Sequence, residues 1–282
     1  MLTTHTIPAI RNALGELRNT GLKIGYVPTM GALHEGHISL IRKAMELSDA
    51  VIVSIFVNPT QFGPDEDFST YPRPLESDLD ICKKHGVHAV FHPPVEELYD
   101  GDEQIRISAG ELSSRLCGKT RPGHFDGVLQ VVNKFFNIIQ PDVAVFGQKD
   151  IQQLLLIRQM VTGFRMNIDI LMAPTQREPD GLAISSRNQY LSGAERNAAP
   201  LLYRALKELE ELIRPGEINM DRVTAPLKKK LEQKGLKIDY ISCVEPPHLH
   251  QISRIEKGKN YILAGAVFAG QTRLIDNLII YT

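Results

Sequence analysis

An alternation of strand and helix patterns over the first two-thirds of the 282-residue chain is the strongest constraint on its fold. Residues 50–57 form an almost continuous run of β-branched and aromatic side chains, which is typical of a parallel strand buried on both faces. Further strand-like runs lie at 23–27, 89–91, 143–146 and 167–172, and helical apolar spacing occurs at 6–19, 36–47, 75–85, 127–139 and 151–162. Repeated β-α-β units require right-handed crossovers, so the pattern predicts an α/β fold, a parallel sheet with helices on both faces.

The pattern changes near residue 175. Two helical segments, 194–213 and 221–234, precede three strand-like runs at 237–244, 260–268 and 274–281. Helices followed by strands predict a smaller α+β unit. We therefore expect a sheet domain over residues 1–175 and a C-terminal lid domain over 176–282, with a hinge near 187–192.

Composition excludes several classes of function. Lys and Arg number 32 against 33 Asp and Glu, a net charge of −1, so nothing indicates a nucleic-acid or anionic-membrane partner. The three cysteines form no CxxC pair, which indicates reduced thiols in a cytosolic protein. The longest apolar run, residues 261–270, is about half of the ~20 residues that a membrane helix needs. We expect a cytoplasmic protein with no membrane and no nucleic-acid partner.

Two histidines follow the short strand-like run at 23–27. Ligands of open α/β sheets bind beyond the carboxyl ends of the strands, and His34 and His37 lie there, with Gly36 between them. A helix N-terminus attracts phosphate, and a glycine lets a nucleotide approach the backbone. The sequence therefore favours a phosphate site, although a turn with two solvated histidines remains the alternative for so short a motif.

Two further segments have phosphate-binding chemistry. Lys149 lies in residues 147–150 after the strand-like run 143–146, and Ser185 and Arg187 lie in the loop after the last parallel strand. Hydroxyl and guanidinium groups donate to phosphate oxygens. The alternatives are a helix cap at Asp150, a solvated lysine and an ordinary interdomain linker.

Neutral amides complete the candidate set. Gln61 follows the strand 50–57, and Gln153 lies one helical turn beyond Lys149. Amides bind hydroxyl and carboxylate groups without carrying charge, which suits a small polar hydroxy acid. Packing roles are the alternative for each amide alone.

Two other patterns are set aside. Gly118-Lys119-Thr120 resembles the end of a P-loop, but Ser113 stands where the first glycine belongs, and Pro122 blocks the helix that must follow. The spacing of His85, His88 and His92 is compatible with a zinc site, but the three straddle a helix end and a strand. The identity of any metal ligand stays unknown.

Taken together, these motifs resemble one family. Residues 28–37, 56–62, 120–127, 147–153 and 184–188 are similar, in this order along nearly the whole chain, to motifs of the pantothenate synthetases (pantoate–β-alanine ligases) of the nucleotidyltransferase superfamily. The His-x-Gly-His turn and the Ser-Ser-Arg loop also resemble the signature motifs of class I aminoacyl-tRNA synthetases. Ile184 stands where many members have methionine, a conservative apolar change.

The resemblance implies a Rossmann-like fold and a two-step reaction. ATP would adenylate the carboxylate of (R)-pantoate and release pyrophosphate, and the amine of β-alanine would then attack the pantoyl adenylate, giving pantothenate and AMP. This reaction would place the protein in coenzyme A biosynthesis. The resemblance further implies a requirement for Mg²⁺ and a homodimer.

The resemblance also implies functional residues. The ATP-binding positions are Met30, Gly31, Ala32, Leu33, His34, Glu35, Gly36, His37, Gly147, Gln148, Lys149, Asp150, Gln176, Ile184, Ser185, Ser186 and Arg187. The catalytic groups among them are His34, His37, Lys149, Ser185 and Arg187, and the substrate-binding positions are Gln61, Gln153, Asn58, Tyr71 and Arg121. Attack of a carboxylate on the α-phosphate builds negative charge, which such donors stabilise.

Two other functions remain open from the residues. A nucleotidyltransferase acting on a phosphate ester shares the histidine turn but needs basic residues for its acceptor, whereas Gln61 and Gln153 are neutral. A non-catalytic nucleotide sensor has no need for the imidazoles, and both are present.

Overall fold

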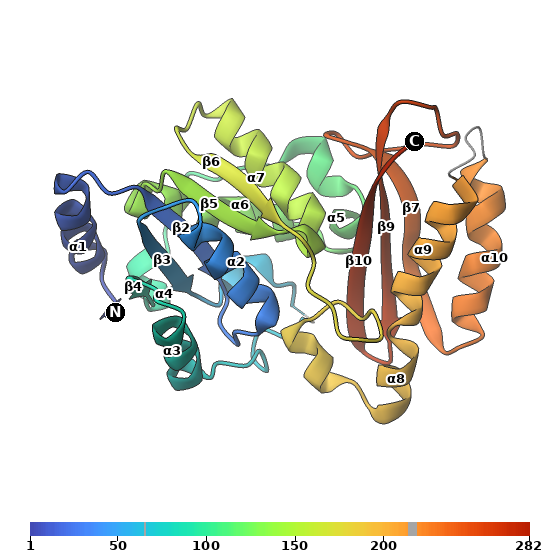
Figure 1. The fold of residues 1–282 in the computed structure, drawn as a ribbon, viewed down its shortest axis with the longest axis horizontal. Coiled ribbons are helices and arrows are strands. Elements are labelled where there is room, and N and C mark those ends of the chain that lie inside the picture. The colour runs from blue at the N-terminus through green and yellow to red at the C-terminus, as the bar shows by residue number, and fades with distance from the viewer. Residues whose placement is uncertain (65, 214–218) are drawn as a thin grey trace. The chain divides into compact units, whose positions relative to one another are not determined.

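The computed structural model describes residues 1–64, 66–213 and 219–282. The chain divides into two compact units (Figure 1). The first, the N-terminal unit, comprises Met1–Ser114, Gly118–Gly147 and Gln153–Pro174. The second, the C-terminal unit, comprises Arg115–Cys117, Gln148–Gln152 and Thr175–Thr282. The short segment 148–152 therefore groups with the C-terminal unit, although it follows a strand of the N-terminal unit.

A parallel sheet organises the N-terminal unit. In the described residues its strand order is β1-β4-β3-β2-β5-β6, formed by Leu2–Thr4, Ala89–Phe91, Ala50–Ile55, Ile24–Thr29, Val143–Gly147 and Asp169–Ala173. Every pairing is parallel. All five expected strands are present, but their ends differ: β3 ends two residues early, β2 ends two residues late and β6 begins two residues late. The three-residue β1 was not anticipated from the sequence. The order reverses between β2 and β5, and such a switch point is where α/β sheets bind ligands.

Helices cover both faces of this sheet, as expected. The helices of this unit include α1 (Ile7–Asn19), α2 (Glu35–Met45), α3 (Leu75–Lys84), α4 (Val95–Leu98), α6 (His124–Ile139) and α7 (Ile151–Gly163). Tyr26 of β2 contacts Phe135 and Phe136 of α6 at ring-centroid distances of 6.1 and 6.3 Å. Its neighbour Val27 instead joins a core cluster that contains Ile41 of α2. Successive strand residues project to opposite faces, so α6 and α2 cover different sides.

An antiparallel sheet with helices forms most of the C-terminal unit. Its strand order is β10-β9-β7-β8, with β7 at Leu236–Glu245, β8 at His250–Gln251, β9 at Asn260–Ala269 and β10 at Thr272–Tyr281. Helices α9 (Leu201–Ile213) and α10 (Met220–Glu232) pack on it. Gly265 of β9 allows α9 to approach the sheet closely, because a Cβ at this position would lie only 2.7 Å from a methyl group of Leu202.

The single helix expected over 194–213 is wrong. The chain forms α8 (Gly193–Ala198) and then α9, which begins at Leu201 directly after Pro200. Proline lacks the N–H that continues a helix and clashes with the preceding turn, but it is tolerated where a helix starts. The expected hinge at 187–192 is occupied largely by a short 3₁₀ helix, η4 (Ser186–Tyr190).

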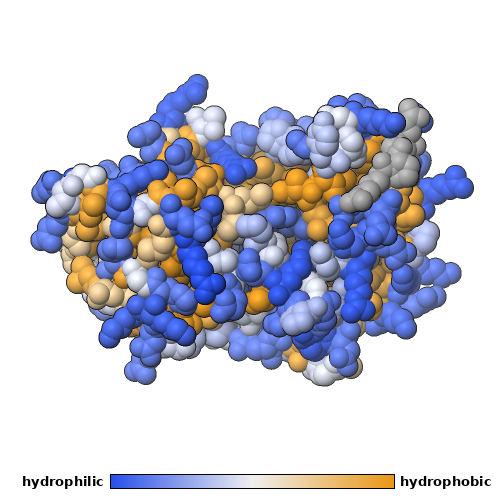
Figure 2. Space-filling model, in the orientation of Figure 1, coloured by the Kyte–Doolittle hydropathy of each residue, from blue (hydrophilic) through white to orange (hydrophobic). Residues whose placement is uncertain are grey.

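The surface is mixed in polarity. Figure 2 shows hydrophilic side chains interspersed with smaller apolar patches on the visible face. Within the described part of the chain, no helix is both long and apolar enough to cross a membrane.

Candidate active site

The turn from β2 into α2 carries the paired histidines. Gly31 has φ +79° and Ala32 has φ +50°, so two successive residues adopt the left-handed conformation that turns the chain after β2. Thr29 fixes the start of the turn, because its hydroxyl donates to the Ser54 carbonyl at 2.7 Å and accepts the Gly31 N–H at 3.1 Å. The turn ends at His34, the N-cap of α2.

His34 and His37 form a reciprocal cap on α2. His34 Nδ1 accepts the Gly36 N–H at 3.1 Å, and His37 Nδ1 accepts the His34 N–H at 3.3 Å. The ring centroids lie 4.1 Å apart. Because each Nδ1 accepts a backbone hydrogen, the neutral imidazoles carry their proton on Nε2. Gly36 makes room for this pair, since a Cβ there would lie 2.8 Å from the His34 ring.

Asp78 of α3 holds the turn from the other side. Its Oδ2 accepts the Ala32 N–H at 2.9 Å and its Oδ1 accepts the Leu33 N–H at 2.7 Å. The side chain is only 1% exposed, and burial raises its pKa, while these two hydrogen bonds and the charge of His92 act in the opposite direction. Sequence reasoning missed Asp78, because nothing in a helical segment 45 residues away marks it as a partner of the turn.

Gln61 is presented by a short 3₁₀ helix, η1 (Pro59–Gln61), after β3. Its Nε2 donates to Met30 Sδ at 3.2 Å, and its Oε1 accepts from Asn58 Nδ2 at 3.2 Å. Asn58 is 1% exposed, and its Nδ2 also donates to the Gly127 carbonyl, while its Oδ1 accepts the Tyr99 hydroxyl. Asn58 therefore orients Gln61 through bonds within the protein.

Arg121 supports the same loop. It forms a bidentate ion pair with Glu66, both N···O distances being 2.6 Å, and one guanidinium nitrogen also donates to the Gln61 carbonyl at 3.5 Å. His124 Nδ1 contacts that carbonyl at 2.7 Å. Tyr71 is buried, with its ring edge-on to Phe62. Gln61 connects these residues to the histidine turn through Met30, so they form one group in the N-terminal unit. Gln153 of α7 lies in the same unit.

Lys149 lies in η3 (Gln148–Asp150), which the C-terminal unit holds through Asn277 of β10. Asn277 Nδ2 donates to the carbonyls of Gln148 and Lys149 at 2.9 and 3.0 Å. Burial lowers the pKa of Lys149, the charge of Arg187 lowers it further, and Asp150 and Asp276 oppose both effects. Lys149 and Arg187 are therefore near enough to interact electrostatically.

The loop that carries Ser185 and Arg187 begins as a small hairpin. The Ile184 N–H donates to the Gln176 carbonyl at 2.9 Å, and Arg177 pairs with Ala183 in an antiparallel bridge. Ser185 caps η4 by accepting the Arg187 N–H at 3.3 Å. The C-terminal unit thus contains a second group of candidate residues, which are Gln148, Lys149, Asp150, Gln176, Ile184, Ser185, Ser186 and Arg187.

Comparisons with known proteins identify the family. A profile of the pantoate-beta-alanine ligase family matches residues 2–279. The chain belongs to this family. It is 48% identical over 281 residues to the pantothenate synthetase of Caldicellulosiruptor saccharolyticus, with 99% of both chains covered.

Solved structures agree with this membership. The ligase matches the crystal structure of pantothenate synthetase from Thermus thermophilus with a TM-score of 0.89 and 40% identity, over 100% of both chains. It matches pantoate-beta-alanine ligase from Francisella tularensis, complexed with beta-gamma ATP and beta-alanine, with a TM-score of 0.83 and 38% identity, over 99% of this chain and 97% of that chain. The enzyme joins pantoate to β-alanine using ATP.

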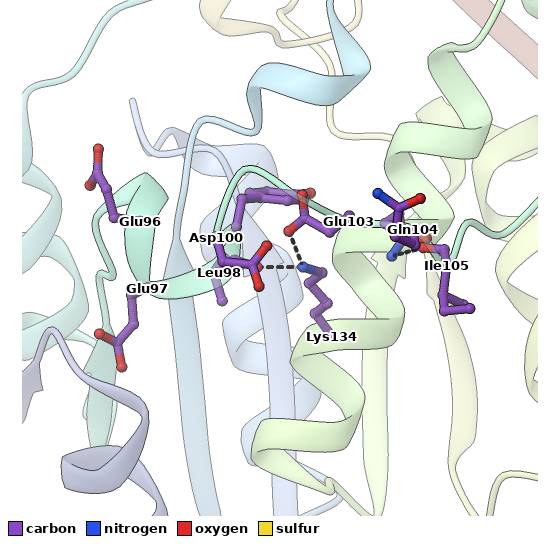
Figure 3. A pocket seen from close by; sticks show the side chains of 10 residues that line it. Glu96, Glu97, Leu98, Asp100, Glu103, Gln104, Ile105 and Lys134 are labelled. Carbon is purple, nitrogen blue, oxygen red and sulfur yellow. Dashed lines mark hydrogen bonds and ion pairs between the residues drawn. The ribbon is translucent and has the colours of Figure 1, made fainter.

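A hollow of about 410 Å³ in the N-terminal unit of the ligase lies around α4 and α6 (Figure 3). Lys134 reaches from α6 to Glu103 at 2.8 Å, and its ammonium lies 4.2 Å from the Tyr99 ring centroid. The described residues that line the hollow include none of the candidate site residues. Tyr99 connects it to the site, because its hydroxyl donates to Asn58.

Proposed function

We propose that the ligation proceeds through a pantoyl adenylate, with pyrophosphate and AMP as the nucleotide products. The observation that carries this proposal is the pair of imidazoles at the N-terminus of α2, with both Nδ1 atoms engaged by backbone N–H groups. This geometry fixes the tautomer that offers Nε2–H as a donor. Donors at a helix N-terminus are suited to phosphate oxygens that gain negative charge.

In the proposed adenylation step, His34 and His37 donate to the phosphates while the pantoate carboxylate attacks the α-phosphorus. The bond from the α-phosphorus to the bridging oxygen breaks, and pyrophosphate leaves with the electron pair. Lys149, Ser185 and Arg187 donate to the same nucleotide. Positioning and electrostatic stabilisation are the main sources of catalysis in phosphoryl and nucleotidyl transfer, and none of these groups forms a covalent bond to the substrate.

We assign pantoate to Gln61 and Gln153. Gln61 is 9% exposed, and Met30, Asn58 and η1 fix its orientation. A neutral amide donates to a carboxylate and accepts from a hydroxyl without neutralising the nucleophile. Asn58 and Arg121 act here as positioning residues for Gln61, and Tyr71 packs behind the same loop.

Magnesium is proposed to bind with the ATP. No group of three or more His, Cys, Asp or Glu side chains in the described residues forms a cage for a metal ion. Mg²⁺ needs no such cage, because it is usually held by substrate phosphates, water and one or two carboxylates. Asp150, which is exposed next to Lys149, would be the carboxylate. The ion would supply charge neutralisation on the phosphate oxygens.

The remaining assignments follow the family resemblance. We propose a homodimer, which the mass of the enzyme from light scattering would test. We propose residues 176–282 as a lid domain to which 148–152 is attached, supported by the grouping of these segments in one compact unit. A cytoplasmic location is supported by the scattered cysteines.

Removal of either imidazole tests the assignment. His34→Ala and His37→Ala are each expected to reduce pyrophosphate release from ATP and pantoate by about 100-fold or more, the usual effect of losing one transition-state donor. His5→Ala is the matched control, because His5 is exposed and lies before α1. Pyrophosphate release near the wild-type rate in either variant contradicts the proposed roles.

A further inference from the structure

We propose that Asp276 and Asn277, adjacent residues of β10, are positioning residues that hold both nucleotide-binding segments of the C-terminal unit. Asn277 fixes the segment that carries Lys149, and Asp276 fixes the hairpin that leads into Ser185 and Arg187. The inference rests on the proposed nucleotide contacts of these residues.

Asn277 uses its whole amide group on the Lys149 segment. Its Nδ2 donates to the carbonyls of Gln148 and Lys149 at 2.9 and 3.0 Å, and its Oδ1 accepts from Gln148 Nε2 at 3.3 Å. The side chain is 1% exposed. Three hydrogen bonds from one rigid amide fix the position and the orientation of the Lys149 backbone, from which the ammonium group is presented.

Asp276 acts on the second segment. Its carboxylate forms a bidentate pair with Arg177, with N···O distances of 2.5 and 2.8 Å, and it is 4% exposed. The Arg177 guanidinium also lies 3.7 Å from the Tyr203 ring centroid and donates to the Gly181 carbonyl at 3.0 Å. Arg177 is therefore held on three sides, and it forms one strand of the hairpin that ends at Ile184.

The strand geometry explains how neighbouring residues serve two loops. Consecutive strand side chains project to opposite faces of a sheet. Asp276 shares a face with the core residues Leu274 and Ile280, whereas Asn277 projects to the opposite face, toward η3. Burial of polar groups in an apolar strand is costly unless they are hydrogen-bonded. Asp276 and Asn277 obtain their hydrogen-bond partners from the hairpin and from the Lys149 segment, respectively. The same strand therefore supports both nucleotide-binding segments.

The electrostatics of Lys149 depend on this support. The charged groups that act on its ammonium are Asp150, Arg187 and Asp276. Asp276 attracts it, and Arg187 repels it. A shift of the Lys149 segment relative to β10 changes both interactions. We therefore expect the loss of Asn277 to lower activity only when Lys149 is present.

A double-mutant cycle tests this. Pyrophosphate release from ATP and pantoate, without β-alanine, is measured for Asn277→Ala, Lys149→Ala and the double variant, together with thermal unfolding. We expect Asn277→Ala to reduce kcat/KM for ATP by about 10-fold or more, and by less than about 2-fold in the Lys149→Ala background, because coupled residues are non-additive. The same cycle with Asp276→Asn and Arg187→Ala tests whether Asp276 positions the hairpin that leads into Arg187.

Controls separate positioning from stability. Asn277→Asp has nearly the same volume but lacks the donor to the two carbonyls, so it is expected to lose activity as well. Asn260→Ala, an exposed position at the start of β9, is expected to leave the rate unchanged. Equal fold-losses in both Lys149 backgrounds, or a wild-type rate for Asn277→Asp, overturn the proposal. A wild-type rate for Lys149→Ala instead overturns the proposed nucleotide contact of Lys149.

Discussion

Replacement of Gly127 by alanine tests whether α6 positions the loop that presents Gln61. A Cβ at residue 127 would lie 2.3 Å from the Thr60 carbonyl oxygen and 2.8 Å from the Gln61 nitrogen, whereas ordinary contacts begin near 3.4 Å. These neighbours are backbone atoms, so η1 or α6 must shift by about 1 Å. Overpacking of this kind costs about 1–3 kcal/mol. Alanine regains about 1 kcal/mol of helix propensity, and subtracting this gain from the overpacking cost leaves an expected net loss of roughly 0–2 kcal/mol.

Urea unfolding and calorimetric titration with pantoate measure the two consequences. We expect lower stability together with pantoate affinity reduced by about 10-fold, because a 1 Å misplacement of a binding group is costly. Gly15→Ala is the matched control: Gly15 lies inside α1 with no atom within 4 Å of its Cβ position, so alanine should stabilise by roughly 0.5–1 kcal/mol. A Gly127→Ala enzyme as stable as the wild type, with unchanged pantoate affinity, would refute the reasoning.

Two further predictions concern the same loop. Gln61→Ala should weaken pantoate binding by about 10-fold and leave ATP binding nearly unchanged, because the variant loses one amide group that contacts pantoate. A titration that shows unaltered pantoate affinity would contradict this. Burial raises the pKa of Glu66, but the hydrogen bonds and the charge of Arg121 outweigh it and lower the pKa below its ordinary value of 4.5. The stabilisation is present above pH 4.5 and is lost as the pH falls through the lowered pKa. The unfolding free energy of the wild type should therefore decline more steeply in acid than that of Glu66→Gln, and parallel pH profiles would contradict this.

Local patterns were sufficient to predict most elements of the fold. The boundaries of β4 were predicted to the residue, because a short apolar run stands between a helix end and two prolines. The break between α8 and α9 was missed because amphipathic spacing continues across Pro200, although proline stops a helix. Strands β1 and β8, of three and two residues, are too short to show any periodicity.

Candidate site residues could be proposed from their position in the sequence where they follow a strand end. His34 lies five residues after β2 and Lys149 two residues after β5, at the sheet edge where ligands bind, and both side chains suit a phosphate. The residues that position these segments do not follow a strand end. Asp78 accepts from Ala32, 46 positions away, and Asn277 donates to Lys149, 128 positions away. One signal was present in the sequence: Asp276 and Asn277 interrupt an otherwise apolar run in β10, and buried polar residues need partners.

The route of oxygen tests the central claim, an acyl adenylate, most directly. Pantoate labelled with ¹⁸O in its carboxylate is incubated with ATP, Mg²⁺ and β-alanine, and the products are analysed by mass spectrometry. If the carboxylate attacks the α-phosphate and the amine then displaces AMP, one labelled oxygen must appear in AMP and none in pyrophosphate. Unlabelled AMP, or label in pyrophosphate, would contradict the account.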